Sequence, residues 1–365
     1  MDDARPAKVE LRRGWTTGTC ATAAATAAYE ALLTGTFPEL VTVALPRGGT
    51  ATLAVVGTRF EPGAPTAMVI KDAGDDPDVT HGAEIRASVT PAAAGAGVVF
   101  RAGEGVGTVT LPGLPVAVGE PAINPGPRAM IRDAIAAIAE RHGAAGDVIV
   151  TVSVPGGQAL AAKTLNGRLG IVGGLSILGT TGVVIPFSCA AWIHSIHRGI
   201  DVARAAGLPH LAAATGSTSE AAVKALYGLP EAALIDMGDF VGGTLKYLRR
   251  HPVPRLTLAG GFAKLVKLAQ GHMFLHSSKS RVDMPGLARL LGTLGAPADL
   301  LAEAAAANTA AQVLAAAMQR GLPLANAVAG RARAVVAEAL AAETDVEVVV
   351  FDRQGVLVGR AGFRA

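Results

Sequence analysis

The sequence predicts an α/β protein with two parts, a two-layer α+β domain followed by a domain built on a parallel sheet. The length of 365 residues suits about two domains at roughly 100–200 residues each. Residues 1–145 contain two helical segments around a run of short strands, which is typical of a two-layer α+β domain. In the second part, residues 146–365, the segment 211–270 alternates strands and helices with a period of roughly 22 residues, which indicates βαβ winding. We expect the boundary near residues 143–146.

The elements of the first domain follow from local patterns. Residues 21–33 are strong helix formers, which Thr17 or Thr19 can cap and which Gly35 can end. Alternating apolar residues predict a hairpin of two strands, 41–45 and 50–56. Further strands are expected at 67–71, 83–89, 98–101 and 107–110, before a helix at 127–142.

The second domain is predicted from short apolar runs separated by helical segments. The expected strands are 147–154, 211–214, 232–235, 255–259, 346–351 and 355–358. The expected helices are 189–206, 217–227, 240–250, 261–270, 286–294, 308–320 and 324–342. Strands that alternate with helices of about three turns imply a parallel sheet with right-handed crossovers.

Composition and charge exclude several classes of protein. The 32 basic and 29 acidic residues leave a net charge of +3, and no basic stripe with interleaved aromatics suggests nucleic-acid binding. Cys20 and Cys189 lie far apart, which excludes a disulfide scaffold and a cysteine zinc site and fits a reducing cytoplasm. Residues 169–193 carry no charge, but their many glycines indicate a buried element rather than a membrane span.

Glycine recurs where three predicted strands of the second domain turn into helices. These turns are Thr215-Gly216-Ser217, Asp236-Met237-Gly238 and Gly260-Gly261. Ligands of open parallel sheets bind beyond the carboxyl ends of the strands, where glycine lets the backbone approach them. We therefore favour a nucleotide-like ligand there, with Asp236 suited to ribose hydroxyls, although glycine also serves in ordinary tight turns.

Two segments of the chain allow two interpretations each. Residues 166–182 are rich in glycine but match neither a Walker loop nor a strict dinucleotide fingerprint. They contact a ligand, or they form a strand and turn packed against another backbone. Residues 71–78 contain four carboxylates, which suit either a divalent cation or a solvated turn. We favour the turn and expect no metal held by the protein.

Two histidine pairs have helical spacing, but neither lies in a metalloprotease motif. Packing is the favoured role for His194 and His197. His272 and His276 are followed by basic residues, so that segment could bind anions or supply an acid or a base.

Five segments together resemble one known family. They are RGWTTGTCA (13–21), KDAGDDPD (71–78), PAINPGPR (121–128), the glycine-rich residues 166–182, and Gly271-His272. In this order they resemble the cobalt-precorrin-5B C-1-methyltransferase (CbiD) family. The resemblance extends from about Leu11 to the C-terminal hairpin.

The resemblance implies methylation by S-adenosylmethionine at C-1 of cobalt-precorrin-5B, giving cobalt-precorrin-6A, in the anaerobic corrin branch of cobalamin biosynthesis. It implies a Rossmann-like second domain, a cytoplasmic location, and a tetrapyrrole substrate whose cobalt needs no protein site. It leaves homo-oligomerisation open. A nicotinamide-dependent oxidoreductase and a non-catalytic tetrapyrrole carrier are the alternatives.

The resemblance allows residues to be assigned to the binding of the donor and the substrate. Methyl transfer mostly requires alignment of these reactants in a dry site. For the methyl donor we expect Gly179, Thr180, Thr181, Gly182, Gly216, Ser217, Asp236 and Gly238. For the substrate carboxylates we expect Lys71, Arg128, Lys163, Arg168 and Lys264. No catalytic base is obligatory, and Asp72 and His272 are the weak candidates.

Overall fold

The computed structural model describes residues 11–61, 63–340 and 343–364, and its contacts divide the chain between Ser188 and Cys189. Both units mix helices with strands, which confirms the α/β class. The division differs from the boundary predicted at 145/146. The reason is strand β9 (Val148–Ser153), which we expected to begin the second domain but which lies in the first unit's main sheet.

The first unit contains a five-stranded sheet and two long helices. Its sheet has the order β4-β5-β6-β9-β7, in which only the pair β7 and β9 is parallel. The strands are β1 (Gly14–Trp15), β2 (Leu40–Ala44), β3 (Thr50–Ala54), β4 (Gly57–Arg59), β5 (Thr66–Ile70), β6 (Glu84–Pro91), β7 (Val98–Ala102), β8 (Thr108–Val109), β9, β10 (Ile171–Val172) and β11 (Val183–Val184). The helices are α1 (Thr17–Thr34), α2 (Pro125–His142) and the short α3 (Gly157–Ala161).

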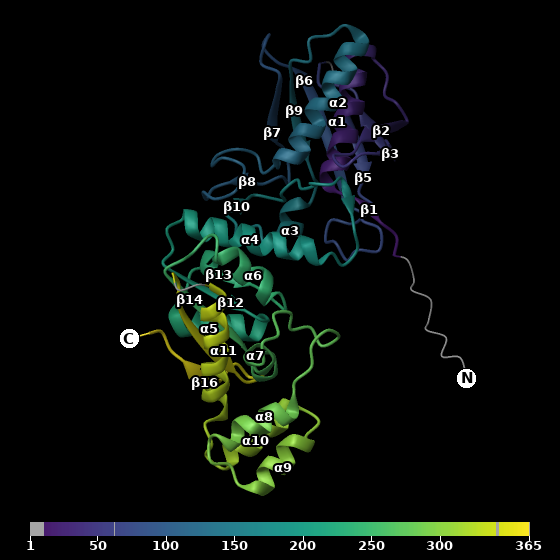
Figure 1. The fold of residues 1–365 in the computed structure, drawn as a ribbon. Coiled ribbons are helices and arrows are strands. Elements are labelled where there is room, and N and C mark those ends of the chain that lie inside the picture. The colour runs from purple at the N-terminus through teal and green to yellow at the C-terminus, as the bar shows by residue number, and fades with distance from the viewer. Residues whose placement is uncertain (1–10, 62, 341–342, 365) are drawn as a thin grey trace, which may run out of the picture. The chain divides into compact units, whose positions relative to one another are not determined.

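Helix α1 lies at the centre of the first unit, side by side with α2 and against strands β5 and β6 (Figure 1). Its alanines and Cys20 are almost completely buried, because small side chains let neighbours approach the helix on all sides. Thr16, rather than Thr17 or Thr19, is the N-cap, and Gly35 ends the helix in the left-handed region as predicted.

The second unit is built on a five-stranded sheet with helices on both faces. Its strands are β12 (His210–Ala214), β13 (Leu234–Asp236), β14 (Arg255–Gly261), β15 (Asp345–Phe351) and β16 (Leu357–Ala361). Its helices are α4 (Cys189–Ala205), α5 (Ser217–Tyr227), the 3-10 turn η1 (Glu231–Ala233), α6 (Val241–Leu248), α7 (Phe262–Ala269), α8 (Met284–Gly292), α9 (Ala298–Ala306), α10 (Ala310–Gln319) and α11 (Leu324–Leu340). Helix α5 packs on one face, while α4, α6, α7 and α11 share a larger core with the other.

The order of this sheet is β13-β12-β14-β15-β16, and its first four strands are parallel. The chain therefore starts on an internal strand, places β13 on one side of it and then crosses to place β14 on the other. The connections that leave β12 and β14 diverge at their carboxyl ends, which is where open parallel sheets form a crevice. The predicted hairpin at the end of the chain is β15 with β16, which adds an antiparallel edge.

Some elements differ from those predicted. Helix α9 was missed, strand β13 is shortened because η1 occupies its predicted start, and residues 341–342 of the expected last helix lie outside the described residues. Residues 169–193 contain two short strands and the first turn of α4. Several of their apolar side chains are exposed, so this run is less buried than expected.

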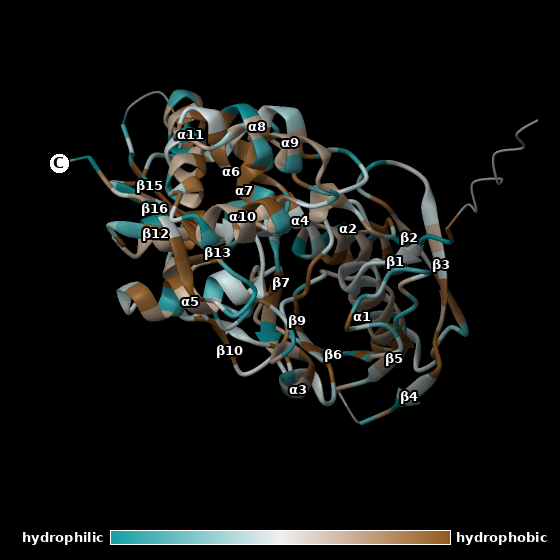
Figure 2. Cartoon of the chain, turned by 90° about the horizontal axis from the view of Figure 1, so that it is seen from below, coloured by the Kyte–Doolittle hydropathy of each residue, from teal (hydrophilic) through white to brown (hydrophobic). Residues whose placement is uncertain are grey.

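Hydropathy along the second unit is mixed rather than uniformly apolar. Figure 2 shows hydrophilic and hydrophobic stretches following one another along helices such as α8 and α9. Among the described residues, no helix combines the length and the apolar character that crossing a membrane requires.

A buried carboxylate connects the C-terminal hairpin to the rest of the second sheet. The Glu347 side chain on β15 is fully buried, and its Oε2 accepts a hydrogen bond of 2.8 Å from Thr257 and another from the Tyr227 hydroxyl. Its Oε1 lies 2.7 Å from the Arg360 guanidinium on β16. Burial and the neighbouring carboxylate raise the pKa of Tyr227 to about 12, so the phenol stays a hydrogen-bond donor.

We predict that Arg360→Met lowers the free energy of unfolding by about 2–4 kcal/mol, because it leaves a buried carboxylate without its cation. Arg353→Met, on the exposed turn of the same hairpin, should change it by less than about 0.5 kcal/mol. Urea unfolding at neutral pH measures both. Adding Glu347→Gln to Arg360→Met should restore part of the loss, and equal stability of the two single variants would contradict the prediction.

Candidate functional site

The three glycine turns predicted to share an edge of the second sheet do so. Ala214, the last residue of β12, is in register with Asp236 of β13 and Ala259 of β14. The Ala214 carbonyl accepts hydrogen bonds of 3.0 Å from Met237 N and 3.1 Å from Gly238 N. The ends of β12, β13 and β14 therefore meet at one edge, which we call the carboxyl edge.

Glycine is required at two positions of this edge. Gly238 has a φ of +55°, a backbone conformation that residues other than glycine rarely adopt. A Cβ added to Gly260 would lie 2.8 Å from Oγ1 of Thr215, so β12 and β14 can approach only because that position is glycine. The edge is thus closely packed where the connections that follow the two strands diverge.

The Lys264 side chain crosses the carboxyl edge. Its ammonium donates a hydrogen bond to the Thr215 carbonyl and lies 3.1 Å from Oδ1 of Asp239, on the turn after β13. Lys264 thereby connects the ends of β12 and β13 from the first turn of α7. We predicted it as a contact for substrate carboxylates, and the structure instead gives its ammonium two partners within the protein. Asp239 directly follows the predicted turn Asp236-Met237-Gly238. Nothing in the neighbouring sequence predicts that its carboxylate pairs with Lys264.

Helix α5 begins at this edge with its amide groups available. Gly216 is its N-cap residue and has no side chain with which to cap the first turn, and Ser217 follows it. A Cβ added to Gly216 would meet no atom within 4 Å, so there is open space beside it. An uncapped helix N-terminus next to open space suits an anionic or polar ligand group.

The segment that contains His272 packs beside the same turn. The Leu275 amide donates to the Asp239 carbonyl at 3.0 Å, and the Lys267 ammonium donates to the Leu275 carbonyl at 2.8 Å. His272 is half-buried, and its amide donates to the Lys267 carbonyl at 3.0 Å. This segment is therefore held next to Asp239 by backbone contacts.

In the first unit, residues 179–182 support the start of α1. The Thr19 hydroxyl donates to the Gly182 carbonyl at 2.7 Å, and the Thr16 amide donates to the same carbonyl at 3.1 Å. A Cβ on Gly179 would lie 2.3 Å from Oγ1 of Thr16. Of the two interpretations of the glycine-rich segment, these contacts favour a strand and turn packed against another backbone. The donor residues predicted at Gly179, Thr180, Thr181 and Gly182 lie there, in a different unit from Gly216 and Asp236.

Lys71 is enclosed in the first unit. Its side chain is 2% exposed, and its ammonium contacts the carboxylate of Asp78 and the hydroxyl of Thr80. Burial raises the pKa of Asp78, but Lys71 and Thr80 lower it further, so it lies below its usual range. The predicted substrate contact is thus replaced by an internal ion pair, which ties the acidic segment 71–78 to the chain that follows it.

Asp72 is also paired within the first unit, although its side chain is 45% exposed. Arg12 holds it in a two-pronged ion pair, the Gly74 amide donates to it at 2.9 Å, and these bonds lower its pKa to about 2. A carboxylate with so low a pKa is a poor proton acceptor near neutral pH. The structure therefore argues against Asp72 as a general base. Among the described residues, no group of three or more potential ligands could hold a metal ion.

The remaining basic candidates differ in their surroundings. Arg128 donates to the carbonyls of Ile123 and Pro121 and to Glu120, so it fastens the start of α2 rather than facing a ligand. Lys163 is exposed in the segment after α3, and Arg168 is half-buried a few residues further along. The assignment of Lys163 and Arg168 to substrate carboxylates stays a prediction.

His197 has a packing role, as predicted from the sequence. Its ring stacks on Tyr247 with centroids 3.9 Å apart, and the Tyr247 hydroxyl donates to Asp201 at 2.6 Å. Burial lowers the pKa of both His194 and His197, which favours neutral rings.

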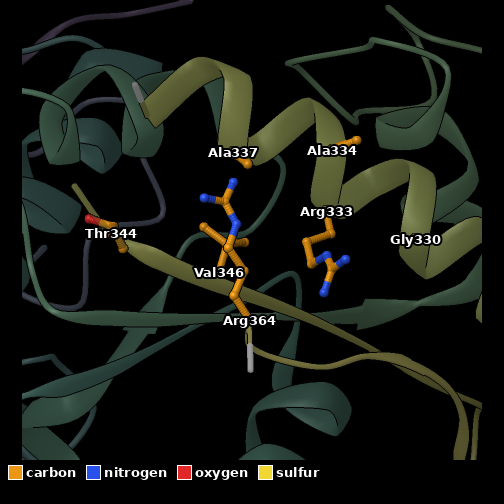
Figure 3. A pocket seen from close by; sticks show the side chains of 7 residues that line it. All are labelled: Gly330, Arg333, Ala334, Ala337, Thr344, Val346 and Arg364. Atoms are coloured by element: carbon orange, nitrogen blue, oxygen red, sulfur yellow. The ribbon is translucent and has the colours of Figure 1, made fainter. Parts of the chain in front are cut away.

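One cavity of about 200 Å³ lies away from the carboxyl edge. Figure 3 shows its lining, which comes from α11, from the start of β15 and from the end of the chain. Because Thr344 and Val346 mark the beginning of β15, the cavity lies at the amino ends of the parallel strands, where α/β sheets do not usually bind ligands.

Comparison with known proteins gives matches over nearly the whole chain. The CbiD family model matches residues 4–186, and the model of the CbiD C-terminal domain matches residues 274–362. A protein of Bradyrhizobium named cobalt-precorrin-5B C(1)-methyltransferase is 61% identical, over 98% of this chain and 96% of its own length. One of the same name from Paramagnetospirillum magneticum is 60% identical over 96% of this chain and 98% of its own length.

Among solved structures, the chain matches a cobalamin biosynthesis protein (cbiD) from Archaeoglobus fulgidus. The match has 30% identity and a TM-score of 0.40, and it covers 72% of this chain and 81% of the other.

We predict that Lys71→Met lowers the free energy of unfolding by about 2–4 kcal/mol, because Asp78 loses the cation that offsets its burial. Lys163→Met, which removes an exposed ammonium, should cost less than about 0.5 kcal/mol. Urea unfolding compares the two. Because the pKa of Asp78 is lowered on folding, the pair stabilises the native state above the ordinary carboxyl range. The difference between wild type and Lys71→Met should therefore shrink as the pH falls through the pKa of Asp78, and a constant difference would contradict the ion pair.

Proposed function

Because the chain belongs to the CbiD family, we propose that it methylates C-1 of cobalt-precorrin-5B with S-adenosylmethionine as methyl donor. The observation that carries this proposal is the 61% identity to a relative of that name along nearly the whole of both chains. The cobalt belongs to the substrate, so the reaction requires no metal held by the protein.

We propose that the methyl donor binds at the carboxyl edge of the second unit, which we interpret as a Rossmann-like sheet. The crossing of the chain from β13 to β14 supports this, since doubly wound sheets bind nucleotides where the winding reverses. Gly216 and Ser217 would offer helix amides to the donor's carboxylate, and Asp236 would accept hydrogen bonds from its ribose. Gly238 would let the backbone approach the ligand.

The other candidates receive revised roles. For the substrate carboxylates we propose Lys163, whose side chain is exposed, and we keep Arg168 on the sequence alone, whereas Lys71 and Arg128 are held inside the first unit. We propose Lys264 as a positioning residue that fixes Thr215 and Asp239 at the donor site. For residues 179–182 we propose a supporting role under α1. His272 remains the proposed acid–base candidate, because its segment is hydrogen-bonded to Asp239 through the Leu275 amide.

The chemistry needs few reactive side chains. The donor supplies a methyl group on a sulfonium, and the new carbon–carbon bond forms while the carbon–sulfur bond breaks and leaves its electron pair on sulfur. An in-line displacement of this kind is accelerated mainly by alignment of the two reactants and by exclusion of water. The protein's part is therefore to hold the sulfonium and the ring carbon in line, which suits an edge where three strand ends meet.

We expect methyl-labelled S-adenosylmethionine and cobalt-precorrin-5B to give a labelled tetrapyrrole and S-adenosylhomocysteine in a one-to-one ratio. Mass spectrometry of the product measures the label. Unlabelled tetrapyrrole together with tight corrinoid binding would instead indicate a carrier, and binding of a nicotinamide dinucleotide alone would indicate an oxidoreductase.

We predict that Asp236→Asn weakens S-adenosylhomocysteine binding by about tenfold or more, since a hydrogen bond to a charged group contributes about 1.5–3 kcal/mol. Isothermal titration calorimetry measures the dissociation constant. Asp299→Asn, which changes an exposed carboxylate on α9, is the control and should leave the affinity unchanged. Equal affinities of the two variants would remove Asp236 from the donor site.

A further inference from the structure

We propose that Trp192 is the aromatic surface on which the adenine ring of the methyl donor stacks. The inference rests on the proposed function and adds to it a residue that determines recognition of the purine. Trp192 lies on the first turn of α4, well before β12, which begins at His210 and is the first strand of the second sheet.

Exposure distinguishes this side chain from the other aromatics of its unit. Trp192 is 46% exposed, and it is the only exposed large aromatic side chain among the described residues from Cys189 onward. Burying an indole is strongly favourable, so an exposed one gains when a ligand stacks on it. Helix α4 otherwise directs apolar side chains such as Ile196 and Ile200 into the core.

The indole is fixed at the carboxyl edge rather than elsewhere on the surface. Its Nε1 donates a hydrogen bond of 3.3 Å to the carbonyl of Asp236, the last residue of β13. A Cβ added to Gly238 would lie 3.7–4.0 Å from atoms of the same ring. The ring is therefore held by its one polar atom and rests against the turn that follows β13.

This position brings an aromatic surface next to the groups proposed for the nucleoside. Asp236 supplies the carboxylate for the ribose, and its backbone carbonyl orients the indole. Gly238 donates to the end of β12, where Thr215 and Lys264 meet. Adenine is flat, uncharged and readily stacked on aromatic side chains, an interaction that alanine substitution shows to be worth about 1–3 kcal/mol per base. One bound nucleoside can thus contact the Asp236 carboxylate through its ribose and the Trp192 indole through its adenine.

The protein contains two tryptophans, Trp15 and Trp192, which allows a direct test. In the Trp15→Phe variant all indole fluorescence comes from Trp192. We expect S-adenosylhomocysteine to quench it, with a midpoint equal to the dissociation constant from calorimetry. In Trp192→Phe, where Trp15 is the only reporter, we expect no saturable quenching at that midpoint.

Affinity provides the second measurement. We expect Trp192→Ala to weaken S-adenosylhomocysteine binding by about tenfold, and Trp192→Phe, which keeps a ring, to weaken it less. Leu226→Ala, which shortens an exposed side chain on α5, is the matched control and should bind as wild type does.

The failures of the two proposals are distinguishable. Wild-type affinity in Trp192→Ala, together with unquenched Trp192 fluorescence, would overturn the stacking role and leave the methyltransferase proposal intact. That outcome would suggest that the exposed indole serves a partner surface. Lack of S-adenosylhomocysteine binding by the wild-type protein would overturn both.

Discussion

The parallel pairing of β12 with strands on both of its sides is the constraint on which the proposed site depends. Because β13 and β14 flank the same strand, three strand ends meet at one edge and the chain must cross β12 between them. Residues from distant parts of the sequence reach one place for that reason alone: the turn after β12, the turn after β13 and Lys264 from α7. The energetic basis is the apolar character of the strands, whose burial between α5 and the helices of the opposite face stabilises the sheet.

Several charged side chains of the first unit have a structural role. Lys71, Asp72 and Arg128 appear in motifs typical of binding sites, yet each is paired with an opposite charge of the same unit, and the ammonium of Lys71 is almost fully buried. A buried charge is costly unless it is paired, so such groups fix the segments that contain them in one arrangement. The ion pairs of this unit therefore maintain the arrangement of the loops that carry them.

Much of the second unit could be predicted from the sequence, because its signals are local. Helix α5 begins after Gly216 and ends before Gly228, and both glycines are visible without a structure. Helix α9 was missed because its alanine-rich sequence offers little contrast between its faces. The two-residue strands β1 and β11 could not be predicted at all, since each exists only through its pairing with a segment more than 150 residues away. The partners of Lys71 and Lys264 are set by the fold in the same way, whereas the carboxyl-edge turns were visible from glycine placement alone.

The packing of α1 has a chemical consequence. The Cys20 thiol is buried among alanines, and burial raises its pKa to about 12, so almost none of it is thiolate near neutral pH. Cys189 is exposed at the first position of α4. A thiol-directed probe will therefore react with one cysteine and ignore the other, which places a single label one turn of helix from Trp192 without any substitution in the chain.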